Sequence, residues 1–474
     1  MKKIMKFENQ SKYLEFTLGV MLMRVALLIP MIALIVIMSG CAVSESEDVE
    51  FNDIDITLLE IGDVETDIAE IPAISGIVQE NEDIIIEADQ QDEVPEPTPA
   101  IPEELLTPPI EETSTYITIF HRPFCTSQTH IELWGGLFRT EDIETLSEGL
   151  RYMTNLTHLT LSANTTQLWM EGWITNPLPR YFPDEYLLDL SQLAEFTNLT
   201  SLSLSGQHIL DISPLAGLEN LTSLSLMLTS ISDITPLEEL INLTFLSLSG
   251  TSINDLSPLA NLTNLEYLLL CGYITDTTFC LKPLANLTNL QILTINARQI
   301  NDIAPLAGLT NLQILELSYN QISDITALAV LENLDILGLS SNQISDLTPL
   351  ANLSNLTLFS AGYNQISDLS PLASLTYLRL LWLQNNQISD LTPLANLWNL
   401  RTLELHDNQI SDLTPLANLW SLSTLLLYDN QISDLTPLAN LPNLRSLWLD
   451  YNPIYDWSPV AHIRLTEGRM VGIW

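Results

Sequence analysis

The sequence predicts an α/β solenoid, a curved stack of short coils, on the basis of three observations. The phrase DNQISDLTPLANL occupies residues 407–419 and recurs unchanged at 429–441. Written out once, as in residues 400–421, the unit follows the pattern L-x-x-L-x-L-x-x-N-x-I. Units of this kind follow one another through residues 156–460 with a period of 22 residues. Together these features make up the leucine-rich-repeat pattern, in which each coil buries its apolar face against its neighbours.

Each unit begins with a short predicted strand. In residues 402–406 the side chains alternate, so Leu403 and Leu405 point inward and the other three face outward. Four further apolar residues fill the interior from the opposite side: Ile410, Leu413, Leu416 and Leu419. We expect a parallel β-sheet on the concave face and bulkier turns on the convex face, so that the stack bends into an arc.

A proline marks the return of most coils. Pro258 and Pro283 are 25 residues apart rather than 22, while Gln192 and Ala327 take the place of proline in two coils. The prolines at this position are Pro214, Pro236, Pro258, Pro283, Pro305, Pro349, Pro371, Pro393, Pro415, Pro437 and Pro459. Because proline restricts φ and lacks an N–H, we expect a 3-10 turn or an extended segment there instead of a long helix.

An asparagine follows the strand in each of the later coils. These residues are Asn320, Asn342, Asn364, Asn386, Asn408, Asn430 and Asn452. A buried amide can both donate and accept hydrogen bonds to backbone groups. Stacked coil upon coil, these side chains are expected to form a ladder. Asn-Leu-Thr triplets also recur, as at Asn220 and Asn242, and we interpret them as part of the repeat rather than as glycosylation sites.

The first 41 residues predict a lipoprotein signal peptide. Basic residues precede the apolar run VALLIPMIALIVI at 25–37, which is short beside the roughly 20 residues of a spanning helix. The following MSGC at 38–41 resembles the lipobox of bacterial lipoproteins, although Met38 stands where leucine is usual. The resemblance implies lipidation at Cys41 and attachment to the extracellular face of a bacterial membrane through this lipid alone. An uncleaved anchor is the alternative.

The remaining segments outside the regular repeat differ in composition. Residues 42–115 contain no Lys or Arg and many Glu, Asp and Pro, which favours an acidic, mostly disordered tether. Residues 116–155 are expected to cap the first coil, and 461–474 to form a C-terminal cap or tail. The irregular insertion at 165–186 is either a degenerate extra coil or an aromatic loop that contacts a ligand.

The composition argues against several classes of function. With 16 basic and 59 acidic residues the net charge is −43, so the chain repels nucleic-acid phosphates. No matched nucleophile and base, glycine-rich phosphate loop or metalloprotease helix is present, so we predict neither an enzyme nor a cofactor. Four scattered cysteines do not form a zinc or disulfide framework. Cys271 and Cys280 could close a small loop or remain free thiols.

The 22-residue period, the wording NQISDLTPLANL and the secretion signal together resemble the internalin family of bacterial surface proteins over about residues 190–460. The resemblance implies a curved solenoid that binds a partner protein on its concave side, without catalysis. Internalins usually continue into an immunoglobulin-like domain, and this sequence instead stops at Trp474 soon after the repeats. A host-invasion role is therefore not carried over.

The outward strand positions differ between the two halves of the stack. N-terminal coils carry small residues there, such as Ser203 and Ser225. Four C-terminal coils place Trp382, Glu404, Leu426 and Trp448 in one column, with Gln384, His406, Tyr428 and Asp450 in the next. Outward positions are solvated by default, and exposed tryptophan is costly unless a partner covers it. These eight residues, spanning roughly 15 Å along the stack, are the predicted partner-binding site.

The predicted partner is another protein. Because the predicted site contains acidic residues, a basic protein is favoured. A carbohydrate-binding module for wall or host glycans, with Trp382 and Trp448 as platforms, is one alternative. A structural envelope spacer is another, and the eight residues could also merely decorate a solvated sheet. His406 lies close in sequence to Asp407 and near Glu404 and Asp429, but the spacing is loose for a metal site and we predict none.

The lipobox resemblance leads to a test of anchoring. We expect Cys41→Ala to move the protein from the membrane fraction to the medium, or to leave an unprocessed precursor, because the lipidated residue is gone. Fractionation and palmitate labelling of intact cells measure this directly. A mutant that fractionates, migrates and labels like the wild type would contradict the assignment of Cys41.

Overall fold

The computed structural model describes residues 116–119, 122–125, 128–135, 153, 155–163, 187–272, 280–296 and 299–463. These residues belong to one compact unit, Ser114–Trp474. The predicted signal peptide with Cys41, the predicted tether and the insertion at 165–186 lie outside the described residues. Among the residues that are described, no helix is long and apolar enough to cross a membrane.

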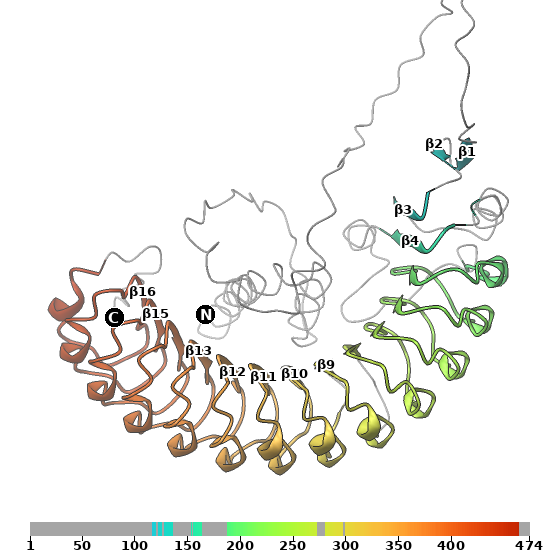
Figure 1. Ribbon diagram of the computed structural model, residues 1–474. Coiled ribbons are helices and arrows are strands. Elements are labelled where there is room, and N and C mark those ends of the chain that lie inside the picture. Colours follow the sequence, from blue (N-terminus) through green and yellow to red (C-terminus); the bar gives the residue numbers. More distant parts are fainter. Residues whose placement is uncertain are drawn as a thin grey trace, which may run out of the picture. The chain divides into compact units, whose positions relative to one another are not determined.

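Within the described residues, 14 strands form a single sheet in chain order from β3 to β16. Neighbouring strands are parallel throughout, as in the pair Leu403↔Leu425 of β14 and β15. The strands are β3 (His130–Gly135), β4 (His158–Ala163), β5 (Ser201–Ser203), β6 (Ser223–Ser225), β7 (Phe245–Ser247), β8 (Tyr267–Leu269), β9 (Ile292–Thr294), β10 (Ile314–Glu316), β11 (Ile336–Gly338), β12 (Leu358–Ser360), β13 (Leu380–Trp382), β14 (Thr402–Glu404), β15 (Thr424–Leu426) and β16 (Ser446–Trp448). The strands line the inner edge of the repeat arc (Figure 1).

A 3-10 turn lies on the outer edge of each coil from η2 onward (Figure 1). The turns are η2 (Ser191–Glu195), η3 (Ser213–Leu215), η4 (Thr235–Leu237), η5 (Ser257–Leu259), η6 (Lys282–Asn286), η7 (Ala304–Gly308), η8 (Thr326–Val330), η9 (Thr348–Leu350), η10 (Ser370–Leu372), η11 (Thr392–Leu394), η12 (Thr414–Leu416), η13 (Thr436–Leu438) and η14 (Ser458–Val460). The repeated proline occupies the first turn, as Pro415 does in η12. The predicted leucine-rich-repeat solenoid, with its tight proline-containing return, is confirmed.

The described residues before the regular coils form both antiparallel and parallel strand pairs. β1 (Tyr116–Ile119) and β2 (Arg122–Cys125) form an antiparallel pair. β3 instead pairs parallel with β4, so it is the first strand of the long sheet although it lies in the range expected for the cap. The parallel sheet therefore begins at His130, one strand earlier than the periodic sequence indicates.

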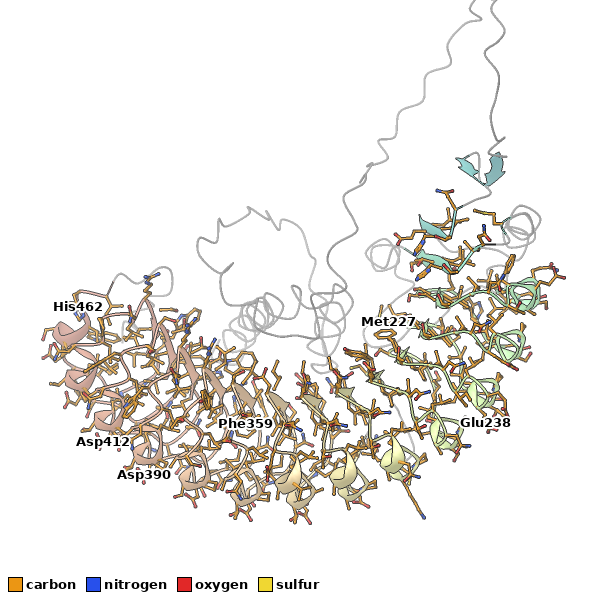
Figure 2. All side chains as sticks on the ribbon, viewed as in Figure 1. Met227, Glu238, Phe359, Asp390, Asp412 and His462 are labelled. Atoms are coloured by element: carbon orange, nitrogen blue, oxygen red, sulfur yellow. The ribbon has the colours of Figure 1, made fainter. Side chains whose placement is uncertain are left out.

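The core is a continuous column of leucine and isoleucine. Leu403 and Leu405 are buried from the strand side, and the four residues predicted to fill the far side of the same coil are buried as well: Ile410, Leu413, Leu416 and Leu419. Figure 2 shows Phe359 inside the stack, whereas Asp390 and Asp412 lie beside the outer turns. Each fully buried Leu or Ile stabilises the fold by about 1.5–3 kcal/mol. Each coil adds one layer of such residues to the core.

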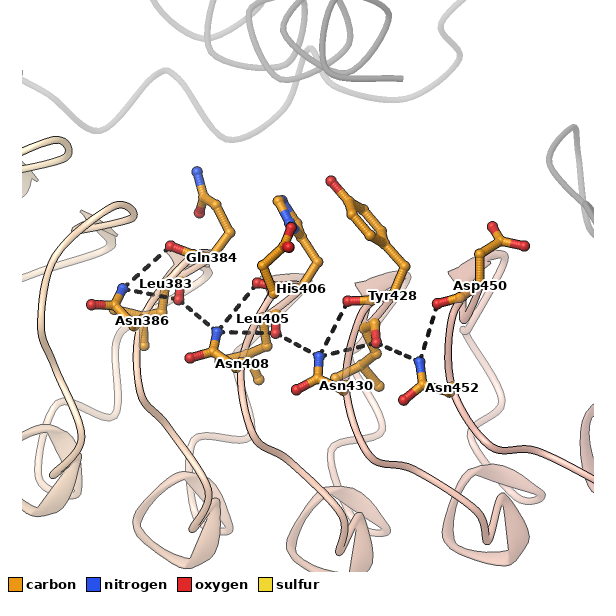
Figure 3. Close-up of polar contacts among 12 residues, drawn as sticks. Leu383, Gln384, Asn386, Leu405, His406, Asn408, Tyr428, Asn430, Asp450 and Asn452 are labelled. Carbon is orange, nitrogen blue, oxygen red and sulfur yellow. Dashed lines mark hydrogen bonds and ion pairs between the residues drawn. The ribbon is translucent and has the colours of Figure 1, made fainter. Parts of the chain in front are cut away.

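The predicted asparagine ladder is present. Asn386 Nδ2 donates to Leu383 O and Gln384 O of its own coil, at 3.0 and 3.3 Å, and to Ala361 O of the previous coil at 3.0 Å. Asn386 Oδ1 accepts from Ile366 N at 2.9 Å. The same set recurs in the following coils, as the dashed lines in Figure 3 show. One amide thus satisfies four backbone groups.

In earlier coils a threonine takes the ladder position. Thr229 Oγ1 donates to Leu226 O at 2.7 Å, and Thr251 Oγ1 donates to Leu248 O at 2.5 Å. A hydroxyl carries one hydrogen, so it can donate only one such bond, and here that bond stays within the coil. The side-chain ladder between coils is therefore denser in the C-terminal half.

A second asparagine ladder precedes the strands, and the sequence reasoning missed it. Asn399 Nδ2 donates to Thr376 O of the previous coil at 2.7 Å, and Asn443 Nδ2 donates to Trp420 O at the same distance. Equivalent bonds come from Asn220, Asn242, Asn264, Asn289, Asn311, Asn333 and Asn355. The signal was visible as the asparagine of the Asn-Leu-Thr triplets at 220 and 242, which has a structural role.

A third repeated contact holds the start of each 3-10 turn. Asp390 Oδ1 accepts from Thr392 N at 2.8 Å. Hydrogen bonds from the hydroxyl and then the N–H of Thr392 lower the pKa of Asp390. The same two kinds of hydrogen bond lower the pKa of Asp189, Asp233, Asp255, Asp324, Asp346, Asp368, Asp412, Asp434 and Asp456. These carboxylates favour the ionised, turn-forming state.

We predict that Asn386→Ala lowers the free energy of unfolding by about 2–4 kcal/mol, because four backbone groups lose their partner in a buried site. Chemical denaturation followed by circular dichroism measures this. Gln387→Ala is the matched control, since Gln387 is the exposed neighbour, and it should stay within about 0.5 kcal/mol. Equal effects from both substitutions would contradict the ladder's contribution.

A second prediction concerns pH. A carboxylate whose pKa is lowered on folding stabilises the fold above its unfolded pKa, and that stability disappears as pH falls through the folded value. Asp390→Asn, Asp412→Asn and Asp434→Asn combined should therefore lose less in melting temperature than the wild type between about pH 5 and about pH 2.5. Thermal unfolding at each pH measures the difference. Identical pH profiles would show that other carboxylates control acid unfolding.

Candidate functional site

Eight residues on strands β13–β16 and just after them form what we call the C-terminal concave patch: Trp382, Gln384, Glu404, His406, Leu426, Tyr428, Trp448 and Asp450. The sheet register pairs Trp382 with Glu404, Glu404 with Leu426, and Leu426 with Trp448. Figure 3 shows Gln384, His406, Tyr428 and Asp450 projecting in one row from the same side of consecutive coils. The two predicted columns are therefore brought together as expected.

The degree of burial differs from the expectation. Trp382 is 3% exposed, Glu404 and His406 are 2% exposed, and Leu426 is 1% exposed. Gln384, Tyr428, Trp448 and Asp450 are half-buried. The expectation that outward strand positions are solvated is thus wrong for four residues of the patch. Neighbouring strands are only about 4.8 Å apart, so large side chains in adjacent columns cover one another.

Several contacts fix the orientation of the patch residues. The His406 and Tyr428 rings stack, with centroids 4.1 Å apart and planes at 12°. His406 Nδ1 lies 3.0 Å from Asp407 Oδ2, and Asp407 adopts the left-handed conformation with φ of 56° at the turn after the strand. Trp448 Nε1 donates to Ser446 Oγ at 3.3 Å. The rings are therefore held in place before any partner arrives.

Burial changes the acidity of two patch residues. It raises the pKa of Asp450 above its ordinary value. It also raises the pKa of Tyr428, with a smaller contribution from the charge of Asp407, so the phenol stays protonated. A neutral phenol can donate a hydrogen bond, and a partly desolvated carboxylate interacts more strongly with a cation than one in water does.

In the β13 coil of the patch, two buried polar atoms have no hydrogen-bond partner among the described residues. They are the donor Trp382 Nε1 and the acceptor Gln384 Oε1, which belong to neighbouring outward positions of one coil. A buried polar group without a partner costs about 1–3 kcal/mol. A ligand that supplies an acceptor to the indole and a donor to the amide would remove that cost. This pair is the clearest sign of a binding surface in the patch.

A third outward column, which we call the apolar column, continues the concave face toward the N-terminus. It occupies the first position of β7–β13 and consists of Phe245, Tyr267, Ile292, Ile314, Ile336, Leu358 and Leu380. Phe245, Tyr267, Ile314 and Ile336 are half-buried, and the others are buried. Sequence reasoning missed it because only the two later outward positions were compared. The alternation of the strands predicts that their first position also faces outward, and comparing this position across coils reveals the column.

One carboxylate lies beside the apolar column. Glu316 Oε1 accepts from Ser318 N at 2.9 Å, and burial raises the Glu316 pKa. The side chain lies over Gly338 of the next strand, where a Cβ would stand 1.8 Å from Glu316 Oε2. Glycine at 338 therefore leaves room for this carboxylate. An acid set among apolar side chains favours a partner that presents apolar residues and a cation together.

The sequence also raised the questions of a metal site near His406 and of a disulfide between Cys271 and Cys280. Within the described residues no group of three or more His, Cys, Asp or Glu side chains could hold a metal ion, the surroundings of His406 included. Cys271 and Cys280 form no disulfide with each other: the first is buried, with its Sγ 3.3 Å from Thr294 Oγ1, and the second is exposed. The alternatives for this pair were a small loop closed by a disulfide and two separate thiols, and the structure shows two thiols.

Comparison with known proteins places this geometry in a family. A model described as Leucine Rich repeats (2 copies) matches residues 288–330, 310–352, 332–374, 352–396, 378–418, 398–440 and 420–462. An internalin, InlF, from Listeria monocytogenes is 36% identical with a TM-score of 0.59, over 69% of this chain and 89% of that one. This chain is an internalin-like leucine-rich-repeat protein.

A second solved structure extends the likeness to another bacterial genus. A leucine-rich-repeat protein from Leptospira interrogans is 25% identical with a TM-score of 0.54, over 65% of this chain and 87% of that one. No curated protein sequence matches the chain. The family model matches within residues 288–462, which include the coils that carry the C-terminal concave patch.

Proposed function

We propose that this internalin-like protein binds another protein on its concave face, through the C-terminal concave patch and the adjoining apolar column. The observation that carries the proposal is the pair of unpartnered buried atoms, Trp382 Nε1 and Gln384 Oε1. Half-buried Tyr428 and Trp448 continue the same two columns two and three coils further on. Leucine-rich-repeat solenoids use extended concave surfaces for binding. Trp and Tyr are also enriched among residues that dominate interface energy.

The chemistry of the surface favours a basic partner with apolar side chains. Glu404 and Asp450 lie in the patch, and Glu316 lies beside the apolar column. The chain as a whole carries a net charge of −43, which accelerates encounter with a positively charged protein and slows encounter with an acidic one. Association should therefore weaken as salt rises, because the Debye length shortens from about 10 Å at 0.1 M to about 3 Å at 1 M.

The site of action that we propose is the outer face of a bacterial cell membrane, where the protein serves in adhesion or envelope interaction. The support is the MSGC lipobox resemblance at 38–41, with Cys41 as the lipidated residue. The acidic composition of residues 42–115 agrees with a tether that lifts the repeats from the membrane. The charge balance and the absence of basic motifs in this segment argue against a nucleic-acid partner.

Identification of the partner comes first. A cross-linked pull-down from intact cells recovers a protein partner, and a glycan array tests the carbohydrate alternative. Selective glycan binding without a protein partner would favour the carbohydrate module. No selective partner in either experiment would favour a structural spacer.

With a protein partner in hand, we predict that Trp448→Ala and Tyr428→Ala each weaken binding at least tenfold, or about 1.4 kcal/mol. Both side chains are half-buried, so they retain surface for a partner. Isothermal titration calorimetry measures the affinity. Trp382→Ala should also weaken binding. Because Trp382 is buried, this substitution can destabilise the fold, so the melting temperature of the variant is measured as well.

Ser203→Ala is the matched control, because Ser203 occupies the same central outward column as Trp448 but lies on β5, eleven coils before β16. It should leave the affinity within about twofold. Unchanged affinity in both the Trp448 and Tyr428 variants would place the partner elsewhere. The aromatic insertion at 165–186 would then be the next segment to test.

A further inference from the structure

A separate feature of the last coils is a row of arginines on the flank of the solenoid, just before the strands. Arg401 N donates to Arg379 O at 2.8 Å, Ser423 N donates to Arg401 O at 2.8 Å, and Arg445 N donates to Ser423 O at 2.9 Å. These bonds place the four residues at one position of four consecutive coils. Arg401 and Arg445 are exposed, and Arg379 is half-buried.

The row is unusual for this chain. In earlier coils the same position carries Glu266 and Asp335, so the sign of the charge reverses along one column. The described part of residues 187–463 contains one further Lys or Arg, Lys282. A chain with 16 basic and 59 acidic residues thus gathers three arginines on one flank.

Large aromatic side chains precede the arginine position by two or three residues in three of these coils. Trp398 and Trp420 occupy the same position of neighbouring coils and are 62% and 63% exposed. Tyr377 lies next to that position in the coil before and is 62% exposed. Exposed aromatics are expensive in water, and a cluster of them marks a surface that another molecule covers. These indoles lie before the strands, so they do not belong to the concave face.

The flank ends in a hollow. A cavity of about 300 Å³ is lined by Leu441, Pro442, Arg445 and His462, among others. Most of its lining residues are apolar, and Arg445 is one of the polar ones. A partner that places a carboxylate on Arg445 could therefore also place an apolar side chain in the hollow.

We propose that this flank, formed by Tyr377, Arg379, Trp398, Arg401, Trp420 and Arg445, binds an acidic peptide segment of a partner protein. Arginine pairs with carboxylates in a bidentate geometry, and Trp, Tyr and Arg are the residues that most often dominate protein interfaces. Ser423 interrupts the row, so three of the four coils carry a positive charge at this position and each can pair with a separate carboxylate. A uniformly charged polymer would gain from a cation in every coil.

The surface is independent of the concave face and opposite to it in charge preference. The concave patch and Glu316 favour a basic partner, whereas the flank favours an acidic one. The two surfaces can therefore engage two different proteins, or a basic and an acidic region of one protein. The flank thus adds a second partner class to the proposed function.

The test uses the purified full chain and a fluorescein-labelled peptide of about nine residues made of Glu-Glu-Leu units, which spans roughly 30 Å when extended. Fluorescence anisotropy is read at roughly 0.15 M salt, where the Debye length of about 8 Å limits repulsion from distant acids. We expect saturable binding. Arg401→Glu combined with Arg445→Glu should weaken it at least tenfold, and so should Trp398→Ala combined with Trp420→Ala.

Two controls separate this proposal from its rivals. Lys282→Glu removes the isolated cation, and Trp448→Ala alters the concave patch, and both should leave peptide binding within about twofold. Thermal unfolding should be unchanged in the arginine pair, because both residues are exposed. The proposal is overturned if the wild type does not bind the peptide, or if Lys282→Glu matches the arginine pair. It is also overturned if polygalacturonate binds more tightly than the peptide with the same arginine dependence.

Discussion

The structure depends on hydrogen bonds that one coil cannot complete alone. Each ladder asparagine satisfies two carbonyls of its own coil, and it also bonds a carbonyl and an N–H that belong to the previous one, as Asn386 does with Ala361 and Ile366. A coil of different length would shift these groups out of reach and leave them buried without partners, which is expensive. The ladder asparagines from Asn320 to Asn452 follow one another at intervals of 22 residues, and this constant period reflects the constraint.

The second ladder fixes the other end of each strand. Asn399 and Asn443 each donate to the carbonyl of the coil before, on the side where the chain enters the strand. With polar contacts before and after it, a three-residue strand is held in register although it is too short to specify register by itself. Side chains at equivalent positions therefore form straight columns across coils. Both proposed binding surfaces consist of such columns.

The sequence was informative wherever one residue type had one physical role. The inward leucines, the proline at the 3-10 turn and the asparagine ladder each follow from a single requirement, and the structure confirms them. Burial of outward residues was predicted poorly, because it depends on the size of neighbours in two other columns. Trp382 and Leu426 illustrate this: they face outward and are nevertheless buried. The apolar column was readable from alternation, but only by comparing the first strand position across coils.

Because the backbone repeats almost unchanged, selectivity can reside only where side chains depart from the repeat. Along the concave face the departures are Glu316 over Gly338, and then the ring stack of His406 on Tyr428. Along the flank they are the change from Asp335 to Arg379 and the paired indoles of Trp398 and Trp420. Both sets fall in the coils where the asparagine ladder is complete. A rigid stack holds aromatic and charged groups at fixed spacing, which lowers the ordering entropy of binding. The coils with the most regular interior are thus the ones whose outer surfaces are best suited to carry distinct contacts.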